Sequence, residues 1–200
     1  MNKIGLLGGT FDPFHNGHLS IAEAASKDLN LEYVYLLPAY VQPFKVGKGV
    51  TAKENRLDML KLVAEEVDFL KVSTVELEQE CISYTYDTIQ HLKEENPGKE
   101  FVFIMGTDSL LTIEKWYKGE ELLESCSFAV GLRPGHEQKT VEEKIDSLRK
   151  KYKTNIYVLK NQLKEISSTE IKERIRSGLG ISELVPGPVE RYIHEQKLYQ

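Results

Sequence analysis

Two glycines and two histidines near the start of the chain are the residues best suited by type and spacing to chemistry. The stretch Gly8–His18 reads Gly-Gly-Thr-Phe-Asp-Pro-Phe-His-Asn-Gly-His. It lies between an apolar run, Ile4–Leu7, which is typical of a buried strand, and Leu19–Leu29, whose apolar residues repeat at helical spacing. We therefore expect this motif to form the turn that leads from a strand into a helix.

A turn of this kind is suited to binding phosphate. Ligands of open parallel sheets bind where the strands end, and glycine lets the backbone approach a ligand closely. The start of a helix offers unpaired N–H groups and the positive end of the helix dipole. His15 and His18 add side-chain donors, because residues three apart are neighbours on one helix face. On these residues alone, a turn shaped by glycine and proline with two surface histidines stays open as an alternative.

The composition is that of a soluble globular protein, which bounds the classes of function. The 200 residues are most simply one domain, and the net charge of −5 argues against a nucleic-acid partner. Cys81 and Cys126 have no metal-ligand spacing, so we expect reduced thiols. No apolar run approaches the roughly 20 residues needed to cross a bilayer, and the residues before the motif are too few for a signal peptide. We expect a cytoplasmic protein without a membrane partner.

Apolar runs and helical repeats alternate along the chain. The predicted strands are Ile4–Leu7, Tyr33–Leu37, Phe69–Ser73, Phe101–Met105, Phe128–Leu132 and Ile156–Leu159. Three of the helices are predicted to begin at capping boxes, Thr51–Glu54, Thr140–Glu143 and Ser167–Glu170. This order favours right-handed crossovers and a Rossmann-like α/β fold, an open parallel sheet flanked by helices. We expect a core at about residues 1–160 and a small helical subdomain at about 161–200.

Further along the chain, hydroxyl and basic side chains indicate a second anion site. Ser167, Ser168 and Thr169 stand at a predicted helix start, where hydroxyls and N–H groups suit polyphosphate oxygens as well as a helix cap. Lys172 follows within that helix. A predicted basic loop at residues 40–50 carries Lys45, which could add a second positive charge.

The two stretches resemble the two signatures of the nucleotidyltransferase superfamily, Gly-x-Phe-Asp-x-x-His-x-Gly-His and Ile-Ser-Ser-Thr-x-Ile/Val-Arg. Every fixed position of the first signature matches, and the second departs only at Lys172, where arginine is usual. Chain length and shorter matches narrow the resemblance to the bacterial nicotinate-nucleotide adenylyltransferase family. These matches are Ser83–Thr85, Gly106–Ser109, Lys115–Tyr117, Arg133–Gly135 and Gln196–Tyr199. The sequence differs at Phe44, where the family commonly has histidine.

The resemblance implies a reaction, its ligands and its site. The reaction is transfer of AMP from ATP to nicotinate mononucleotide, which gives nicotinate adenine dinucleotide and pyrophosphate by direct in-line displacement. Mg²⁺, bound mainly through the ATP phosphates, is the implied cofactor, and a homo-oligomer is compatible with the sequence. The implied catalytic residues are His15, His18 and Lys45. The implied ATP-binding residues are Gly8, Gly9, Thr10, Phe11, His15, His18, Ser167, Ser168, Thr169 and Lys172. The implied acceptor-binding residues are Thr85, Asp108, Trp116, Tyr117 and Arg133.

Alternatives remain open at this stage. The acceptor could instead be nicotinamide mononucleotide or phosphopantetheine, although Trp116-Tyr117 favours a pyridine mononucleotide. The chain could also be a non-catalytic nucleotide sensor, which the presence of His15 and His18 argues against. A dehydrogenase is not favoured, because the early glycines do not form Gly-x-Gly-x-x-Gly.

Overall fold

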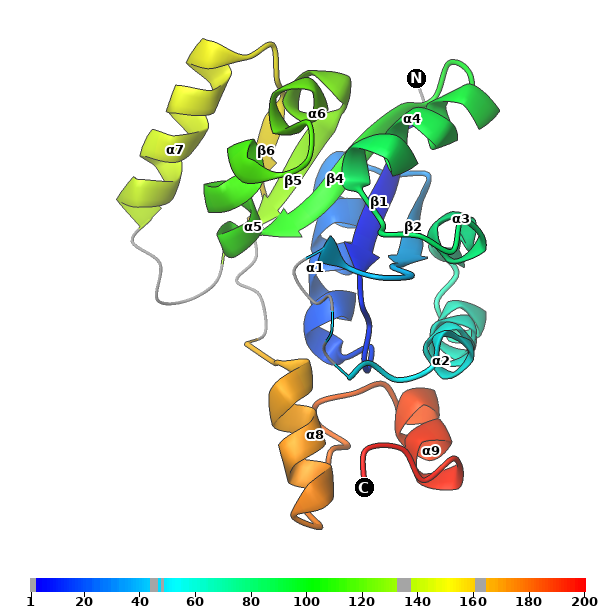
Figure 1. The fold of residues 1–200 in the computed structure, drawn as a ribbon. Coiled ribbons are helices and arrows are strands. Elements are labelled where there is room, and N and C mark those ends of the chain that lie inside the picture. Colours follow the sequence, from blue (N-terminus) through cyan, green and yellow to red (C-terminus); the bar gives the residue numbers. More distant parts are fainter. Residues whose placement is uncertain (1–2, 44–46, 48, 133–137, 161–164) are drawn as a thin grey trace.

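The computed structural model describes residues 3–43, 47, 49–132, 138–160 and 165–200. Within them, six strands form one parallel sheet (Figure 1). The strands are β1 (Lys3–Gly9), β2 (Tyr33–Pro38), β3 (Leu70–Val72), β4 (Glu100–Gly106), β5 (Ser127–Gly131) and β6 (Ile156–Val158). Their order is β3-β2-β1-β4-β5-β6. The chain thus adds β2 and β3 on one side of β1 and then adds β4, β5 and β6 on its other side, so the strand order switches between β1 and β4. Such a switch point is where open α/β sheets bind ligands.

Side chains alternate between the two faces of the sheet along each strand, so the apolar strands present apolar side chains on both faces. Helices cover both faces and bury these side chains. On β4, Phe101, Phe103 and Met105 belong to one buried cluster, whereas Val102 and Ile104 belong to the other. The cluster that contains Val102 also takes in residues of α1 (Asn16–Leu29), α2 (Lys53–Glu66), α8 (Ser168–Arg176) and α9 (Gly187–Glu195). The other cluster takes in residues of α3 (Val75–Glu78), α4 (Thr85–Glu95), α5 (Thr107–Thr112), the 3-10 helix η2 (Ile113–Lys115), α6 (Gly119–Ser125) and α7 (Gln138–Lys151).

The predicted fold class is confirmed, and each predicted strand is present with ends that differ by at most two residues. Two of the three capping boxes are wrong. Helix α2 has Ala52 at its N-cap without a side-chain hydrogen bond, and Thr140 lies inside α7. At the third, Ser167 is confirmed as the N-cap, and its Oγ accepts the Glu170 amide at 3.1 Å. Strand β4 leads directly into a helix, because Thr107 begins α5.

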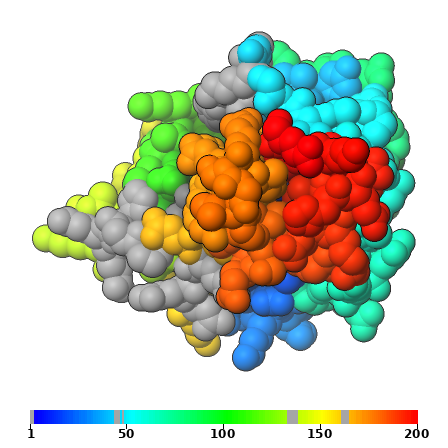
Figure 2. Space-filling model, turned by 90° about the horizontal axis from the view of Figure 1, so that it is seen from below, coloured from blue at the N-terminus to red at the C-terminus, as the bar shows by residue number. Residues whose placement is uncertain are grey.

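The C-terminal helices lie below the carboxyl ends of the strands in the view of Figure 1. Seen from below, α8 (orange) and the last residues of the chain (red) lie side by side, with part of the segment near residue 50 (cyan) at their border (Figure 2). Ile171, Val189 and Ile193 are fully buried in the same cluster as Leu7 of β1. The helical addition therefore shares its core with the sheet and stands next to the motif turn.

Candidate active site

The motif turn crosses the carboxyl end of β1 and is fixed by two buried aromatic rings. Phe11 and Phe14 are almost completely buried. Their ring centroids lie 5.0 and 5.4 Å from that of His18. A Cβ atom at Gly9 would lie 3.0 Å from the Phe11 ring, so a side chain there would press on this buried ring. The turn is thus packed from its interior, which holds the histidines in place.

His15 and His18 cap the first turn of α1 for each other. The Nδ1 atom of His15 accepts the His18 amide, and Nδ1 of His18 accepts the His15 amide, each at 3.3 Å. The two rings stack with centroids 3.6 Å apart. Because both Nδ1 atoms accept hydrogen bonds, each neutral ring carries its proton on Nε2 and is a donor there. The sequence Ser/Thr-x-x-Glu of a usual capping box is replaced here by His-x-x-His.

Three backbone amides at the start of α1, those of His15, Asn16 and His18, are already hydrogen-bonded, so the expected unpaired donors do not include them. The amide of Asn16 donates to the Leu184 carbonyl at 2.8 Å, and the amides of both histidines bond within the cap. The imidazoles of His15 and His18 are therefore the side chains by which the start of α1 lines the cavity beside it.

A cavity of about 280 Å³ opens beside the histidines, and we call it the nucleotide cavity. Its walls come from β1, the motif turn, the first turn of α1, the end of β4 and the start of α8. The lining residues include Gly8, Gly9, Thr10, Phe11, His15, His18, Ile21, Gln42, Phe103, Ser109, Ile166 and Ser168. Its polar groups are thus gathered at the sheet's switch point, as expected for a phosphate ligand.

A second cavity of about 250 Å³ adjoins the first, and we call it the acceptor cavity. Gly8, Gly9, Gln42 and Phe103 line both cavities. The remainder of its lining includes Glu76, Ser83, Tyr84, Thr85, Lys115, Trp116 and Tyr117. The rings of Tyr84 and Tyr117 lie 4.4 Å apart, and Trp116 meets Phe103 edge to face at 6.2 Å. This cavity offers aromatic faces for a flat ring and a helix start for an anion.

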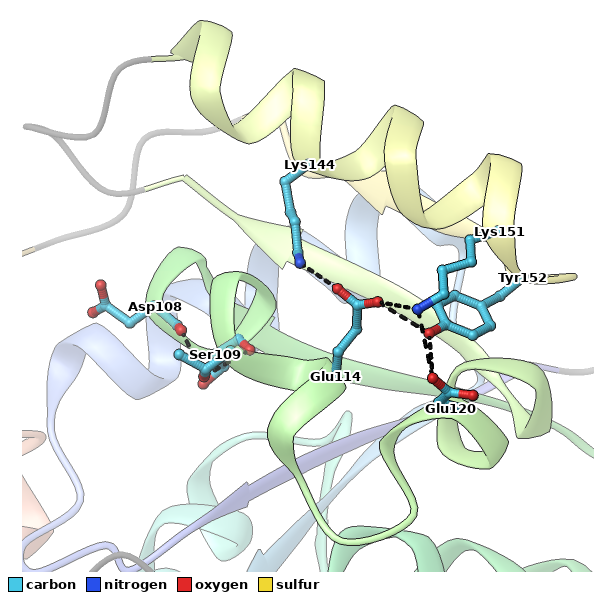
Figure 3. A network of polar contacts seen from close by, with 8 residues as sticks. Asp108, Ser109, Glu114, Glu120, Lys144, Lys151 and Tyr152 are labelled. Carbon is cyan, nitrogen blue, oxygen red and sulfur yellow. Dashed lines mark hydrogen bonds and ion pairs between the residues drawn. The ribbon is translucent and has the colours of Figure 1, made fainter.

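A polar network that joins η2 to α6 and to α7 holds the segment just before Trp116 (Figure 3). Glu114 of η2 accepts Lys144 of α7 at 2.6 Å, and Lys151 and Tyr152 at 3.1 and 3.0 Å. The single hydroxyl proton of Tyr152 is shared between Glu114 and Glu120 of α6, whose Oε1 also lies 3.0 Å away. The hydrogen bond from Lys144, followed by those from Lys151 and Tyr152, lowers the pKa of Glu114 to about 2. The network therefore fixes η2 against α7 two residues before Trp116.

Three residues of the two cavities were not among the predicted site residues. Gln42 accepts the Thr10 hydroxyl at 2.8 Å through Oε1 and forms part of the wall that both cavities share. Glu76 accepts the Thr88 hydroxyl of α4 at 2.9 Å, and its burial raises its pKa against the opposing hydrogen bonds from Thr88 and Ser83. The Ser83 hydroxyl accepts the Tyr40 amide at 3.0 Å. These contacts join segments distant in sequence, and no local pattern signals them.

Comparisons with known proteins agree with this arrangement. The model of the cytidylyltransferase-like family matches residues 6–174. A "Probable nicotinate-nucleotide adenylyltransferase" of Thermoanaerobacter sp. (strain X514) is 40% identical over 99% of this chain and 94% of the relative. A protein of the same name from Clostridium botulinum (strain Eklund 17B / Type B) is 39% identical over 100% and 99%. The chain belongs to the nicotinate-nucleotide adenylyltransferase family.

Solved structures show the same fold. The nicotinic acid mononucleotide adenylyltransferase of Plasmodium falciparum, complexed with NaAD, superposes with a TM-score of 0.80 at 20% identity. The match covers 100% of this chain and 98% of that chain. The same protein complexed with APC gives a TM-score of 0.79 at 19% identity over the same shares. These structures show that the chain has a Rossmann-like sheet, and its membership of the nicotinate-nucleotide adenylyltransferase family makes it an enzyme.

The structure brings together most, but not all, of the site residues predicted from the family resemblance. Those that line a cavity are Gly8, Gly9, Thr10, Phe11, His15, His18, Ser168, Thr85, Trp116 and Tyr117. Ser167 caps α8 and Thr169 is exposed beside it. Asp108 is exposed at the start of α5, next to the cavity residue Ser109, and Lys172 bonds to Asp12. Lys45, Phe44 and Arg133 lie outside the described residues, so their roles stay predictions.

Within the described ranges, no helix is both long and apolar enough to cross a membrane.

Proposed function

We propose that this chain transfers AMP from ATP to nicotinate mononucleotide and releases pyrophosphate, as its family name indicates. The observation that carries this proposal is the pair of adjoining cavities with different linings. One contains the stacked histidines and the other contains Trp116 and Tyr117, and they meet at Gly8 and Gly9. Two substrates that react in line must bind end to end, with the reacting phosphates at the junction.

The proposed chemistry is direct displacement at the α-phosphorus of ATP. The 5′-phosphate of the mononucleotide is already a nucleophile at neutral pH, so the protein needs to align the reactants and stabilise developing charge. The Nε2 protons of His15 and His18 are suited to donate to the α- and β-phosphate oxygens. Their reciprocal cap holds both rings in one orientation before the substrate arrives. Ser168 lines the same cavity and adds a hydroxyl donor.

The acceptor cavity favours an acidic pyridine nucleotide. The ring faces of Trp116 and Tyr117 can stack on a flat heterocycle. Thr85 is the first residue of α4, an 11-residue helix, and a carboxylate is stabilised at such a start. Lys115 lines the cavity as well and adds a positive charge. Together these groups favour the nicotinate carboxylate over a neutral amide.

Mg²⁺ fits this site as a partner of the nucleotide. Among the residues that the structure describes, no group of three or more His, Cys, Asp or Glu side chains could hold a metal ion. Magnesium commonly binds through substrate phosphates and retains several waters, and it neutralises charge on the transferring group. We propose that it enters with ATP and that Asp108, exposed near the nucleotide cavity, bonds to a ribose hydroxyl or to a metal-bound water.

The test is to incubate the purified chain with ATP, Mg²⁺ and nicotinate mononucleotide and to identify the products by mass spectrometry. The proposal expects nicotinate adenine dinucleotide and pyrophosphate in equal amounts, and no adenylylated protein. ATP binding without any product would contradict the proposal and would favour a nucleotide sensor.

A further inference from the structure

Asp12, in the middle of the motif turn, joins three other segments of the chain. Its carboxylate is buried, with 4% of the residue exposed. Oδ1 accepts the Tyr199 hydroxyl at 2.8 Å, and Oδ2 accepts the Thr51 amide at 3.3 Å and the ammonium of Lys172. One side chain thus connects the motif turn to α8, to the residues before α2 and to the last residues of the sequence.

The charges around Asp12 are arranged so that it stays ionised. Burial raises its pKa, but the hydrogen bonds from Lys172, Thr51 and Tyr199 outweigh burial and lower the pKa below the ordinary value. Beneath it, the buried Arg56 donates from Nη1 to the carbonyls of Thr10 and Ala39, both at 2.8 Å. Burial lowers the pKa of Arg56, and the nearby charge of Asp12 opposes this shift only in part. The carboxylate is thus compensated by cations from two helices.

Helix α8 is fixed to the motif turn at two neighbouring points. Ser168 and Lys172 are four residues apart and therefore lie on one face of the helix. The Ser168 hydroxyl donates to the Pro13 carbonyl at 3.2 Å, and Lys172 bonds to Asp12. Ser168 also lines the nucleotide cavity, as does Ile166 just before the helix. Lys172 therefore holds α8 against the turn, and its predicted role as a charge on the ATP phosphates stays a prediction.

Tyr199 completes this contact from the end of the sequence. Burial and the charge of Asp12 raise the pKa of Tyr199, so its hydroxyl remains a donor. Its ring lies 5.0 Å from the ammonium of Lys172, a cation–π distance. The C-terminus is seen between α8 and α9 in Figure 1. The ring and the hydroxyl of Tyr199 therefore act on both partners of the ion pair.

We propose that Asp12, Lys172 and Tyr199 form a positioning cluster that fixes the distance between the histidine pair and the start of α8, and thereby sets the affinity for ATP. His15 and His18 of the first element and Ser168 of the second all line the nucleotide cavity. A phosphate chain that contacts both elements depends on the distance between them. A turn and a helix already held together lose less freedom on binding, which strengthens affinity. The inference rests on the proposed function only in naming ATP as the ligand.

The experiment compares Tyr199→Phe with a matched control, Tyr192→Phe. Tyr192 is also a C-terminal tyrosine whose hydroxyl contacts a carboxylate, Asp58 at 3.1 Å, as well as Asn55 at 2.9 Å, but it joins α9 to α2. The readout is the dissociation constant of a non-hydrolysable, methylene-bridged ATP analogue, measured by calorimetry beside the melting temperature. We expect Tyr199→Phe to raise this constant about tenfold, the effect of one hydrogen bond to a charged group. We expect Tyr192→Phe to lower the melting temperature about as much as Tyr199→Phe does. We expect it to leave the dissociation constant of the analogue unchanged.

Lys172 variants separate positioning from direct phosphate contact. Lys172→Met should weaken analogue binding as much as Tyr199→Phe does, whereas Lys172→Arg, which keeps the pair with Asp12, should stay within about threefold of wild type. If Lys172→Met weakens binding and Tyr199→Phe does not, Lys172 acts on the phosphates and the cluster is refuted. The cluster is also refuted if the dissociation constant of Tyr199→Phe exceeds that of Tyr192→Phe by less than about threefold.

Failure of the cluster is distinguishable from failure of the proposed function. A wild-type chain that binds the analogue but forms no dinucleotide would overturn the proposed reaction, while the binding comparison would still test the cluster. A wild-type chain that makes the dinucleotide, with unchanged binding in Tyr199→Phe, would overturn the cluster alone. A wild-type chain that binds no ATP analogue would overturn both.

Discussion

Replacement of His15 by asparagine or by alanine separates the two roles that the structure gives to this residue. His15 caps α1 through Nδ1, and its Nε2 is the donor proposed to reach the ATP phosphates. The side-chain oxygen of asparagine occupies a position close to that of Nδ1, and asparagine is among the best N-cap residues. It has no atom at the position of Nε2. His15→Asn therefore retains the cap and removes the donor, whereas His15→Ala removes both.

The magnitudes follow from these contacts. Loss of an N-cap side chain costs about 1 kcal/mol. For a chain of 200 residues this lowers the melting temperature by about 2–4 °C. Both variants lose the ring stacked on His18, so the difference between their melting temperatures measures the contribution of the cap. Loss of one donor to developing charge reduces turnover by about 10²–10³-fold, or about 2.7–4 kcal/mol, in both variants.

The assay pairs steady-state pyrophosphate release at saturating ATP with thermal unfolding followed by circular dichroism. His194→Asn is the control, because His194 is an exposed residue of α9 that is not among the residues lining the two cavities, and both quantities should stay at wild-type values. His15→Asn turnover above about one tenth of wild type would refute the role of Nε2. Equal melting temperatures for His15→Asn and His15→Ala would refute the role of the cap.

Two further predictions concern the acceptor cavity and the network behind it. Trp116→Ala should raise the KM for nicotinate mononucleotide at least about tenfold, because stacking on an aromatic ring contributes about 1–3 kcal/mol per base. The dissociation constant of the ATP analogue should not change, and an equal loss of both affinities would contradict the division into two cavities. Glu114→Gln removes a carboxylate whose folded-state pKa is about 2, below the ordinary value of 4.5, so its stabilising contribution is present above pH 4.5 and is lost as the pH falls toward 2. The difference in melting temperature between wild type and Glu114→Gln should be constant from pH 7 to pH 5 and should shrink below about pH 4.5, whereas a difference independent of pH would contradict the ion pairs of Figure 3.

Local sequence patterns predicted the sheet and the motif turn well, because both depend on residues close together in the chain. Phe101–Met105 is apolar throughout, as a strand covered on both faces must be. Gly8–His18 contains its own turn and its own cap. The short helices α3 and α5 escaped prediction because four to six residues are too few to show a helical period.

The contacts that complete the site could not be predicted in the same way. Asp12 and Lys172 are 160 positions apart, and only the fold brings α8 onto the motif turn. Gln42 and Glu76 follow β2 and β3, and they line the cavity with Gly8 and Gly9 because the carboxyl ends of parallel strands lie at one edge of the sheet. The capping-box pattern at Thr51 or Thr140 was misleading, since Ala52 is the N-cap of α2 and Thr140 lies inside α7.

The preference among acceptors tests the central claim most directly. The measurement is kcat/KM for nicotinate mononucleotide, nicotinamide mononucleotide and phosphopantetheine, each with saturating ATP and Mg²⁺ in the pyrophosphate assay. Thr85 at the start of α4 and Lys115 in the same cavity predict the highest value for nicotinate mononucleotide, by at least about tenfold over the amide. Equal values for the acid and the amide would contradict the proposed carboxylate contacts, and a preference for phosphopantetheine would contradict the acceptor assignment itself.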